Sequence, residues 1–324
     1  MEIVHTSVLL QETLRCLAPE TVQPLMVDAT LGEGGHSGAF LSEFPELRII
    51  GVDADPRIQV RARERLAPFG ERIYFYPGWA DEFFLDYPCD WKSPDIILFD
   101  LGISLFHYER SGRGFSFRNE EPLDMRLNPH TGEPAEAIVN TLNEKDLADL
   151  IFQYGEERYS RRIARAITEA RSGSRITTAR TLADIIYHAV PQEYRRGGIH
   201  PATKTFQALR IAVNGELDRL PVMLKAALDV LAEGGKMGVI TFHSLEDRIV
   251  KNFFRDEAKH CICPPEQPIC ICRGKPRVEL LLKKPVSPSA EEVERNPPSR
   301  SARLRVVRKL PQDPAREKMN RDVV

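Results

Sequence analysis

Short apolar runs, each about the length of one strand, recur in the first part of the chain and again near residue 240. Each run is rich in branched or aromatic residues and is bounded by Gly, Asp or Pro, which is typical of strands buried on both faces of a parallel sheet. The pattern predicts an α/β fold. The runs are 25-LMVDA-29, 48-RIIGVDA-54, 72-RIYFY-76, 95-DIILFDLG-102 and 236-KMGVITF-242.

Apolar residues at helical spacing occupy the intervals between these runs. Residues 35–44 and 56–66 have the length of crossover helices, and Pro56 fits the first position of the second helix. A longer helix is predicted over 215–235, where one apolar stripe ends at Gly234-Gly235. That helix leads directly into the last of the five runs.

The strand pattern is interrupted between about residues 106 and 212. Because only helical spacing is found there, we expect an all-helical insertion at 106–212. The predicted helices of the insertion are 144–155, 158–170, 180–190 and 203–213.

The rest of the chain completes a discontinuous first domain, which we place at 1–105 and 213–310. Two last strands are predicted at 277–284 and 302–309, and a polar, Pro-rich connection joins them. The charged tail, 311–324, is expected to fray.

Charge is almost balanced over the whole chain but strongly divided within the insertion. The formal net charge is −2, so there is no overall basic field. Residues 105–157 carry 5 Lys and Arg against 11 Asp and Glu, whereas residues 158–212 carry 11 against 3. A solvated face is one explanation, but this segregation favours contact with an RNA backbone. Arg158, Arg161, Arg162 and Arg165 share one helical face, and the candidate phosphate contacts are Arg158, Arg162 and Lys204.

Neither a secretory signal nor a membrane-spanning stretch is found, so we expect a cytoplasmic protein. Four cysteines crowd into residues 261–272 and could present thiolates to zinc. The C-x-C spacing is less common than C-x-x-C at such sites, and a reduced loop or an oxidation-prone hairpin explains it as well. We therefore assign no metal-binding residue. The four are Cys261, Cys263, Cys270 and Cys272.

The run 28-DATLGEGGHS-37 is a glycine turn between a predicted strand and a predicted helix. Such a turn lets the backbone approach a ligand closely. A dinucleotide fingerprint would need Gly or Ala at Ser37, whereas Asp53, at the end of the second strand, can accept hydrogen bonds from both ribose hydroxyls of an adenosine. The pair predicts an adenosine-containing cofactor, and a plain turn with a solvated Asp is the alternative.

The fourth run, 97-ILFDLGIS-104, places Asp100 at the carboxyl end of a strand beside the expected crevice. A carboxylate there can accept a hydrogen bond from an amine, and Gly102 lets a flat substrate come close. This resembles the fourth motif of class I methyltransferases that act on exocyclic amines. His243 and Ser244 follow the fifth strand and are candidate substrate contacts, although Ser244 with Asp247 also fits a capping box, and a core histidine explains His243 nearly as well.

With these motifs in order, the chain resembles the bacterial 16S ribosomal RNA (cytosine N4)-methyltransferases, the family of ribosomal small-subunit methyltransferase H. The resemblance runs from near the N-terminus to about residue 306. Besides the runs already quoted, it rests on 5-HTSVLLQE-12, 51-GVDADP-56, 112-GRGFSF-117, 122-PLDMRLNP-129, 154-YGEERYSRRIARAI-167, 200-HPATKTFQALRIAVNGEL-217, 241-TFHSLEDRIVK-251 and 296-NPPSRSARLRV-306.

The resemblance implies a class I S-adenosylmethionine-dependent methyltransferase fold, with a Rossmann-like, mostly parallel seven-stranded sheet and an inserted all-helical domain. It implies S-adenosylmethionine as donor and a cytidine in the decoding centre of 16S ribosomal RNA as substrate. The family has a Ser-Pro-Gln-like run where this chain has Leu105-Phe106-His107, and a phenylalanine is usual near Ala80. The donor contacts carried over are Gly34, Gly35, His36, Asp53, Trp79, Ala80, Asp100 and His107.

The amine of cytosine is a poor nucleophile because its lone pair is conjugated with the ring. Asp100 is the candidate catalytic residue, since an acceptor that holds one N–H favours tilting the amine out of the ring plane. The base must also leave any stack to react. Phe115 and Phe117 are therefore candidate stacking surfaces and Arg113 a candidate phosphate contact, although two spaced phenylalanines also fit a core.

Two other functions stay open. One is an amine methyltransferase with another nucleic acid or a protein as substrate, and the other is a ribosome-assembly factor that retains the fold without turnover. The expected partner is 16S ribosomal RNA within the small subunit, with no membrane, and a homodimer is compatible with the sequence.

Overall fold

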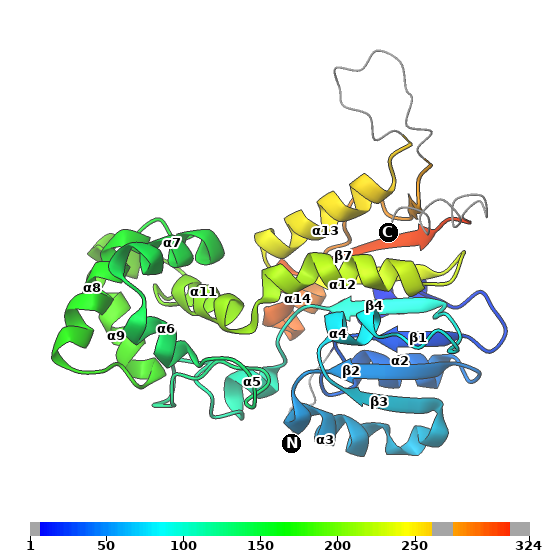
Figure 1. Ribbon diagram of the computed structural model, residues 1–324, viewed down its shortest axis with the longest axis horizontal. Helices are drawn as coiled ribbons and strands as arrows, with labels where there is room; N and C mark the ends of the chain where they lie inside the picture. The colour runs from blue at the N-terminus through cyan, green and yellow to red at the C-terminus, as the bar shows by residue number, and fades with distance from the viewer. Residues whose placement is uncertain (1–6, 261–274, 312–324) are drawn as a thin grey trace, which may run out of the picture. The chain divides into compact units, whose positions relative to one another are not determined.

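The computed structural model describes residues 7–260 and 275–311 (Figure 1). The chain divides into two compact units. We call Met1–Gly102 with Arg219–Val324 the sheet unit, and Ile103–Asp218 the helical unit. Over the described ranges, no helix has the length and apolar character needed to cross a membrane. The predicted tail from residue 312 and the four clustered cysteines lie outside the described residues.

The sheet unit contains a seven-stranded sheet with the order β3-β2-β1-β4-β5-β7-β6. The first five strands are parallel, and β7 is antiparallel to both of its neighbours. This confirms the predicted fold class, a mostly parallel seven-stranded sheet interrupted by helices. The strands are β1 (Leu25–Asp28), β2 (Arg48–Asp53), β3 (Ile73–Pro77), β4 (Ile96–Asp100), β5 (Lys236–Thr241), β6 (Val278–Leu280) and β7 (Arg303–Lys309).

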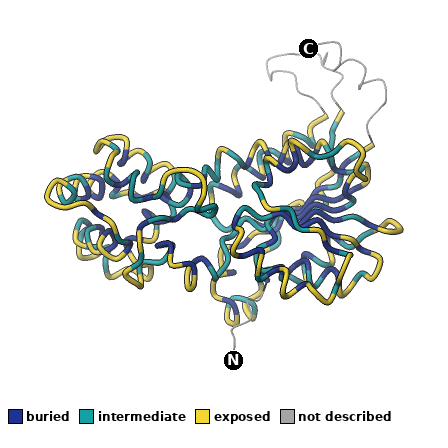
Figure 2. Tube along the Cα trace, turned by 60° about the horizontal axis from the view of Figure 1, so that its bottom comes forward, coloured by how far each residue is buried: buried dark blue, intermediate teal, exposed yellow. Residues whose placement is uncertain are grey.

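Side chains alternate along the central strands between two hydrophobic cores, one on each face of the sheet. Val27 and Ile97 pack into the core that also contains α4 (Ala80–Leu85), α12 (Glu216–Val230) and α13 (Ser244–Glu257). Met26 and Ile96 pack into the opposite core. The helices on that second face are α1 (Leu10–Cys16), α2 (Gly35–Glu43) and α3 (Pro56–Leu66). The central strands are buried along most of their length, and Figure 2 draws buried residues in dark blue.

Two details of the C-terminal part differ from the prediction. β6 is shorter than 277–284, because the chain turns after Leu280 and Val286 takes the place opposite Leu304. The polar, Pro-rich connection, for which no helix was predicted, contains α14 (Ala290–Arg295) and the 3-10 helix Pro297–Ser301. The Ser289 hydroxyl caps α14, and Glu292 accepts a hydrogen bond from the backbone N–H of Leu9, a long-range contact with no sequence signal.

The helical unit has its own hydrophobic core, to which α6, α7, α8, α9 and α11 contribute. The end of α7 packs closely on α11: a Cβ on Gly155 would lie 2.5 Å from the carbonyl oxygen of Lys204. The chain is described throughout residues 101–235, and no strand forms there, as predicted. The helices are α5 (Leu105–Glu109), α6 (Ala135–Thr141), α7 (Glu144–Gly155), α8 (Ser160–Gly173), α9 (Ala179–Ala189), α10 (Gln192–Arg195) and α11 (Thr203–Asn214).

Candidate active site

Three carboxylates end neighbouring parallel strands of the sheet. Asp28 is the last residue of β1, Asp53 of β2 and Asp100 of β4. The strand order reverses at β1, between β2 and β4, and ligands of open α/β sheets bind at the carboxyl ends of the strands beside such a point. The structure thus brings the predicted Asp53 and Asp100 to one edge, together with Asp28, which sequence reasoning did not single out.

Two glycines of the turn after β1 are packed closely against neighbouring side chains. Gly34 has a φ of 76° as the N-cap of α2, and a Cβ on it would lie 2.6 Å from Leu66 Cδ1. A Cβ on Gly35 would lie 2.2 Å from Ser7 Oγ. The left-handed backbone and the close packing both require glycine. The turn can therefore present bare backbone to a ligand, as predicted for a cofactor loop.

The Asp53 carboxylate is fixed by the backbone around it. Oδ2 accepts a hydrogen bond from the N–H of Gly32 at 2.8 Å, and Oδ1 accepts one from the N–H of Asp55 at 2.9 Å. Gln59 Nε2 donates to the carbonyls of Asp53 and Tyr76, at 2.9 and 2.7 Å. Gln59 is a site-supporting residue that sequence reasoning missed, and its signal was a polar residue on the buried face of α3.

The predicted Trp79 and Ala80 follow β3 at the same edge of the sheet. Trp79 is the half-buried N-cap of α4, and its ring centroid lies 4.4 Å from the guanidinium of Arg219. Arg219 also pairs with Asp81 at 2.7 Å, so the ring is held in place. Ala80 is buried in the core, which leaves its backbone as the part able to face a ligand. Arg219 was not predicted from the sequence.

Together these residues fit an adenosine-containing donor. Glycine backbone, a fixed carboxylate and a clamped aromatic ring lie at the ends of β1, β2 and β3. This combination can take the amino-acid end, the ribose and the flat base of such a molecule.

Asp100 is held by two contacts. Its backbone N–H donates to Thr30 Oγ1 at 2.6 Å, and its Oδ2 lies 3.5 Å from Nδ1 of His36. The other oxygen, Oδ1, is buried and has no hydrogen-bond partner of normal geometry among the described residues. A buried oxygen without a donor is costly, so Oδ1 is suited to accept an N–H from a ligand.

Burial raises the pKa of Asp100 to about 7, and the negative charges of Asp28 and Glu246 act in the same direction. The backbone N–H of Gly102 opposes this rise. The space beside Gly102 differs from the expectation that a flat substrate would lie against it: a Cβ there would lie 2.6 Å from the ring of Phe242. Phe242 thus covers the Gly102 backbone.

Asp28 is a second buried carboxyl beside Asp100. Its Oδ2 accepts a hydrogen bond from the Ser37 hydroxyl at 2.7 Å, and its side chain is almost inaccessible to solvent. Burial raises the pKa of Asp28 from 3.8 to about 6, against the effect of the Ser37 and Thr30 donors. The site therefore holds two carboxyls that are harder to ionise than usual.

Replacing Asp28 by Asn tests whether the pKa of Asp28 is raised in the folded protein. The folded chain binds the Asp28 proton more tightly than the unfolded chain, so this stabilisation is complete below about pH 3.8 and is lost as the pH rises through about 6. From about pH 5 to pH 8 we expect Asp28→Asn to gain about 1.4 kcal/mol over the parent in the free energy of unfolding. Urea unfolding of both proteins at about pH 5 and pH 8 measures these free energies. A difference between the two proteins that is the same at both pH values would contradict the raised pKa of Asp28.

The start of α13 corrects the predicted capping box of Ser244 and Asp247. The N-cap is His243, whose ring accepts from the N–H of Glu246, while Glu246 Oε2 accepts from the N–H groups of Phe242 and His243. The box is thus one residue earlier, because His243 has extended backbone and its Nδ1 replaces a hydroxyl oxygen. Asp247 instead pairs with two arginines of β7. Substrate roles for His243 and Ser244 stay predictions.

His107 and Arg113 belong to the helical unit, and both are buried. The His107 ring packs against the rings of Phe106 and Phe115, so its assignment to the donor stays a prediction. Arg113 Nη1 donates to the carbonyls of Arg126 and Leu127, both at 2.8 Å. These bonds favour a role for Arg113 in holding its loop rather than in binding phosphate.

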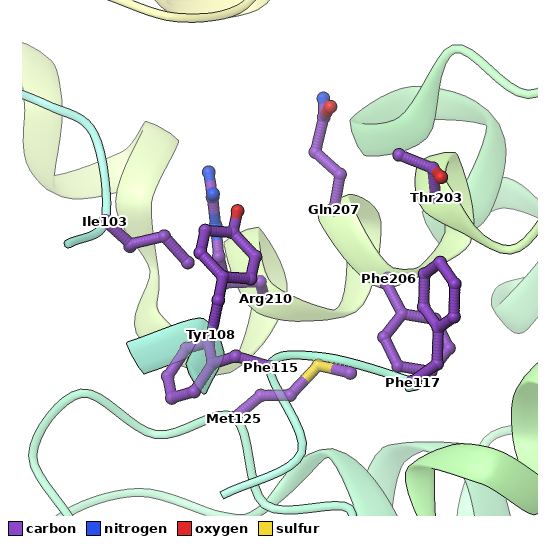
Figure 3. Close-up of a pocket in the computed structure, with 9 residues that line it drawn as sticks. All are labelled: Ile103, Tyr108, Phe115, Phe117, Met125, Thr203, Phe206, Gln207 and Arg210. Carbon is purple, nitrogen blue, oxygen red and sulfur yellow. The ribbon is translucent and has the colours of Figure 1, made fainter. Parts of the chain in front are cut away.

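A pocket of about 120 Å³ lies within the helical unit. Figure 3 shows the predicted Phe115 and Phe117 on its wall, with Phe206 and Gln207 contributed by α11. Phe117 also stacks on His200, with ring centroids 4.6 Å apart. Flat rings beside a carboxamide suit an unstacked base. Besides these four, the lining residues are Ile103, Tyr108, Met125, Thr203 and Arg210.

The predicted basic face is exposed but differs in one respect. Helix α8 begins at Ser160, so Arg158 precedes it instead of sharing its face, because the chain turns through Glu156 at a φ of 48°. Arg161 and Arg162 are exposed on the helix. Arg158 packs its guanidinium over the ring of Tyr194 at 5.0 Å. The predicted Lys204 donates to the carbonyl of Glu156, and Arg165 pairs with Glu169.

Known proteins match this chain along almost its whole length. Residues 2–310 match the model of the MraW methylase family. Ribosomal RNA small subunit methyltransferase H of Treponema denticola is 64% identical over 96% of this chain and 98% of that protein. The protein of the same name from Syntrophotalea carbinolica is 46% identical, over 94% and 98%. A solved rRNA methylase from Streptococcus thermophilus, 10% identical over 93% and 94%, has a TM-score of 0.39, which adds nothing to those matches.

Proposed function

The chain belongs to the MraW methylase family, and from that premise we propose that it methylates the N4 amine of a cytidine in 16S ribosomal RNA with S-adenosylmethionine as donor. The relatives named as small-subunit RNA methyltransferases support the substrate class. The observation that most supports an amine as the methyl acceptor is the position of Asp100. It ends β4 beside the glycine turn, and its buried Oδ1 has no hydrogen-bond partner among the described residues.

The donor supplies an electrophilic methyl group on a sulfonium. The turn at Gly34 and Gly35 holds its amino-acid end, the carboxylate of Asp53 holds the ribose, and the backbone at Trp79 and Ala80 borders the adenine. Asp100 Oδ1 accepts one N–H of the substrate amine and so tilts it out of the ring plane. The chain's main contribution is alignment and the exclusion of water at the reacting atoms.

The helical unit provides the RNA contacts in this proposal. The pocket with Phe115 and Phe117 receives an unstacked base, while Arg162 and its neighbours on α8 contact phosphates. Arg158 and Lys204 add positive charge near that face. Since the substrate is the small ribosomal subunit, the protein acts in the cytoplasm.

Two measurements test the function. Calorimetry should show donor binding, and small subunits isolated without the modification should accept a labelled methyl group that maps to N4 of one cytidine. Donor binding without transfer to any RNA would favour the assembly factor. Transfer to another nucleic acid or a protein, with none to small subunits, would favour the other amine methyltransferase.

A charge reversal on α8 tests the RNA-binding face. The double variant Arg161→Glu/Arg162→Glu should raise KM for small subunits about 10-fold and make the salt dependence of KM shallower, with kcat unchanged. Initial rates over a range of salt concentrations measure both effects. Lys225→Glu, an exposed change in the sheet unit, is the matched control and should have little effect. Equal effects of the two would contradict a specific RNA face on α8.

A further inference from the structure

His36 is a buried histidine with two defined neighbours. It is 5% exposed and lies in the first turn of α2. Its Nε2 lies 3.1 Å from the carbonyl oxygen of Val8, and its Nδ1 lies 3.5 Å from Asp100 Oδ2. A carbonyl oxygen can only accept, so Nε2 carries a proton and donates it. The ring therefore turns Nδ1 toward Asp100.

The contact between Nδ1 and Oδ2 is favourable in only one protonation state. With a neutral His36 ring and an ionised Asp100, two lone pairs face each other. With one proton between them, the pair is either a carboxylic acid donating to Nδ1 or an imidazolium donating to a carboxylate. The geometry thus creates a place for one proton, shared by two side chains from different elements.

We propose that His36 is the proton partner of Asp100 in methyl transfer, taking up, through Asp100, the proton that the methylated amine releases. The inference rests on the proposed function, because it needs an amine substrate at Oδ1. It deepens the contact with the donor that the family resemblance implies for His36 and gives the side chain a role in the reaction.

The bond from sulfur to the methyl carbon breaks, and the bond from that carbon to N4 forms, which leaves N4 with a positive charge and a surplus proton. The N4–H bond then breaks, and its proton moves to Asp100. The carboxylic acid donates to Nδ1 of His36, so the pair holds one proton after turnover and none before it. Release to water after the product leaves restores the pair.

Charged groups from three other places face this pair. Asp28 at the end of β1 and Glu246 in α13 raise the pKa of Asp100 through their negative charges, after burial itself. His243 Nε2 lies 3.0 Å from Glu246 Oε1. The titration accordingly belongs to a coupled group rather than to one residue. The rate of methyl transfer should rise with pH as the pair loses its shared proton.

Two variants separate proton uptake from the polar contact at Asp100 Oδ2. His36→Asn keeps a polar side chain that can donate an N–H to Oδ2 but cannot take up the proton, so the plateau of kcat should fall about 10-fold and its pH midpoint should move down by about half a unit. His36→Ala removes both the contact and the proton site, and kcat should fall about 30-fold. The rates are measured at saturating S-adenosylmethionine, so that a loss of the donor contact implied for His36 does not enter kcat. His260→Asn, an exposed histidine of the sheet unit, is the matched control.

A second readout does not depend on activity. In the donor-free protein, the ¹⁵N shifts of the His36 ring should titrate, and Asp100→Asn should move that titration. An active parent whose His36→Asn variant keeps the same plateau and midpoint would overturn the inference, as would a His36 titration that ignores Asp100→Asn. If the parent itself transfers no methyl group, the proposed function fails, and the nuclear magnetic resonance result still decides whether the two side chains share a proton.

Discussion

Asp100→Asn should lower kcat for methyl transfer about 1000-fold while the protein stays folded. The variant keeps the shape of the side chain and the backbone contact with Thr30, but it removes the negative charge that the developing positive charge on N4 requires. It also removes the site for the released proton. Single-turnover transfer to unmodified small subunits, at saturating donor and near pH 8, measures the loss.

The control for this variant is Asp95→Asn. Asp95 precedes the other end of β4, where its Oδ2 accepts from the N–H of Leu25 and pairs with Lys92, so the same chemical change is made far from the carboxyl end of the strand. This control should transfer methyl groups at nearly the parental rate. Full activity of Asp100→Asn would remove the carboxylate from the mechanism, and with it the assignment of the amine to this end of the sheet.

The strands of the sheet could be predicted from the sequence because each needs only a short run that is apolar on both faces. The same holds for α7, predicted at 144–155, whose apolar spacing and Asn143 cap are local signals. β6 was predicted too long and α14 was not predicted, because both depend on partners far along the chain, Leu304 for the turn after β6 and Leu9 for α14. Period and propensity contain no information about such contacts.

In the candidate site, too, features set by local sequence could be predicted and features set by long-range packing could not. Gly34, Asp53 and Asp100 could be placed because a parallel sheet brings the ends of its strands together. The distance between His36 and Asp100 could not be predicted, since it depends on how α2 packs against the end of β4. Arg113 is the reverse case, because a charged residue in a glycine-rich loop suggests exposure, and only the structure shows it bonded to its own loop.

The arginines of the insertion show that a predicted helical face depends on where the helix begins. Four arginines at helical spacing predicted one basic face, yet the helix begins after the first of them. Arg161 and Arg162 are exposed on α8 and have no ion pair among the described residues, so the RNA hypothesis survives the change of boundary. A charge count over a segment is less sensitive to helix limits than a periodic pattern.

Asp53→Ala should weaken the binding of S-adenosylmethionine about 100-fold. Its carboxylate is already fixed by the N–H groups of Gly32 and Asp55, so it meets the ribose hydroxyls without first having to become ordered. Hydrogen bonds to a charged acceptor contribute about 1.5–3 kcal/mol each, and the two hydroxyls would lose that acceptor together. Calorimetric titration of the donor-free protein measures the dissociation constant, and kcat at saturating donor should change much less than affinity.

In Asp53→Ala, kcat should change less than donor affinity because Asp53 contacts a part of the donor that does not change in the reaction. Its contribution is therefore the same before and during methyl transfer. Asp90→Ala, in an exposed turn of the sheet unit, is the control and should bind like the parent. Unchanged affinity in a folded Asp53→Ala protein would place the adenosine elsewhere. A fall in kcat equal to the fall in affinity would instead show that the end of β2 also aligns the reacting atoms, and the division of labour between Asp53 and Asp100 would be wrong.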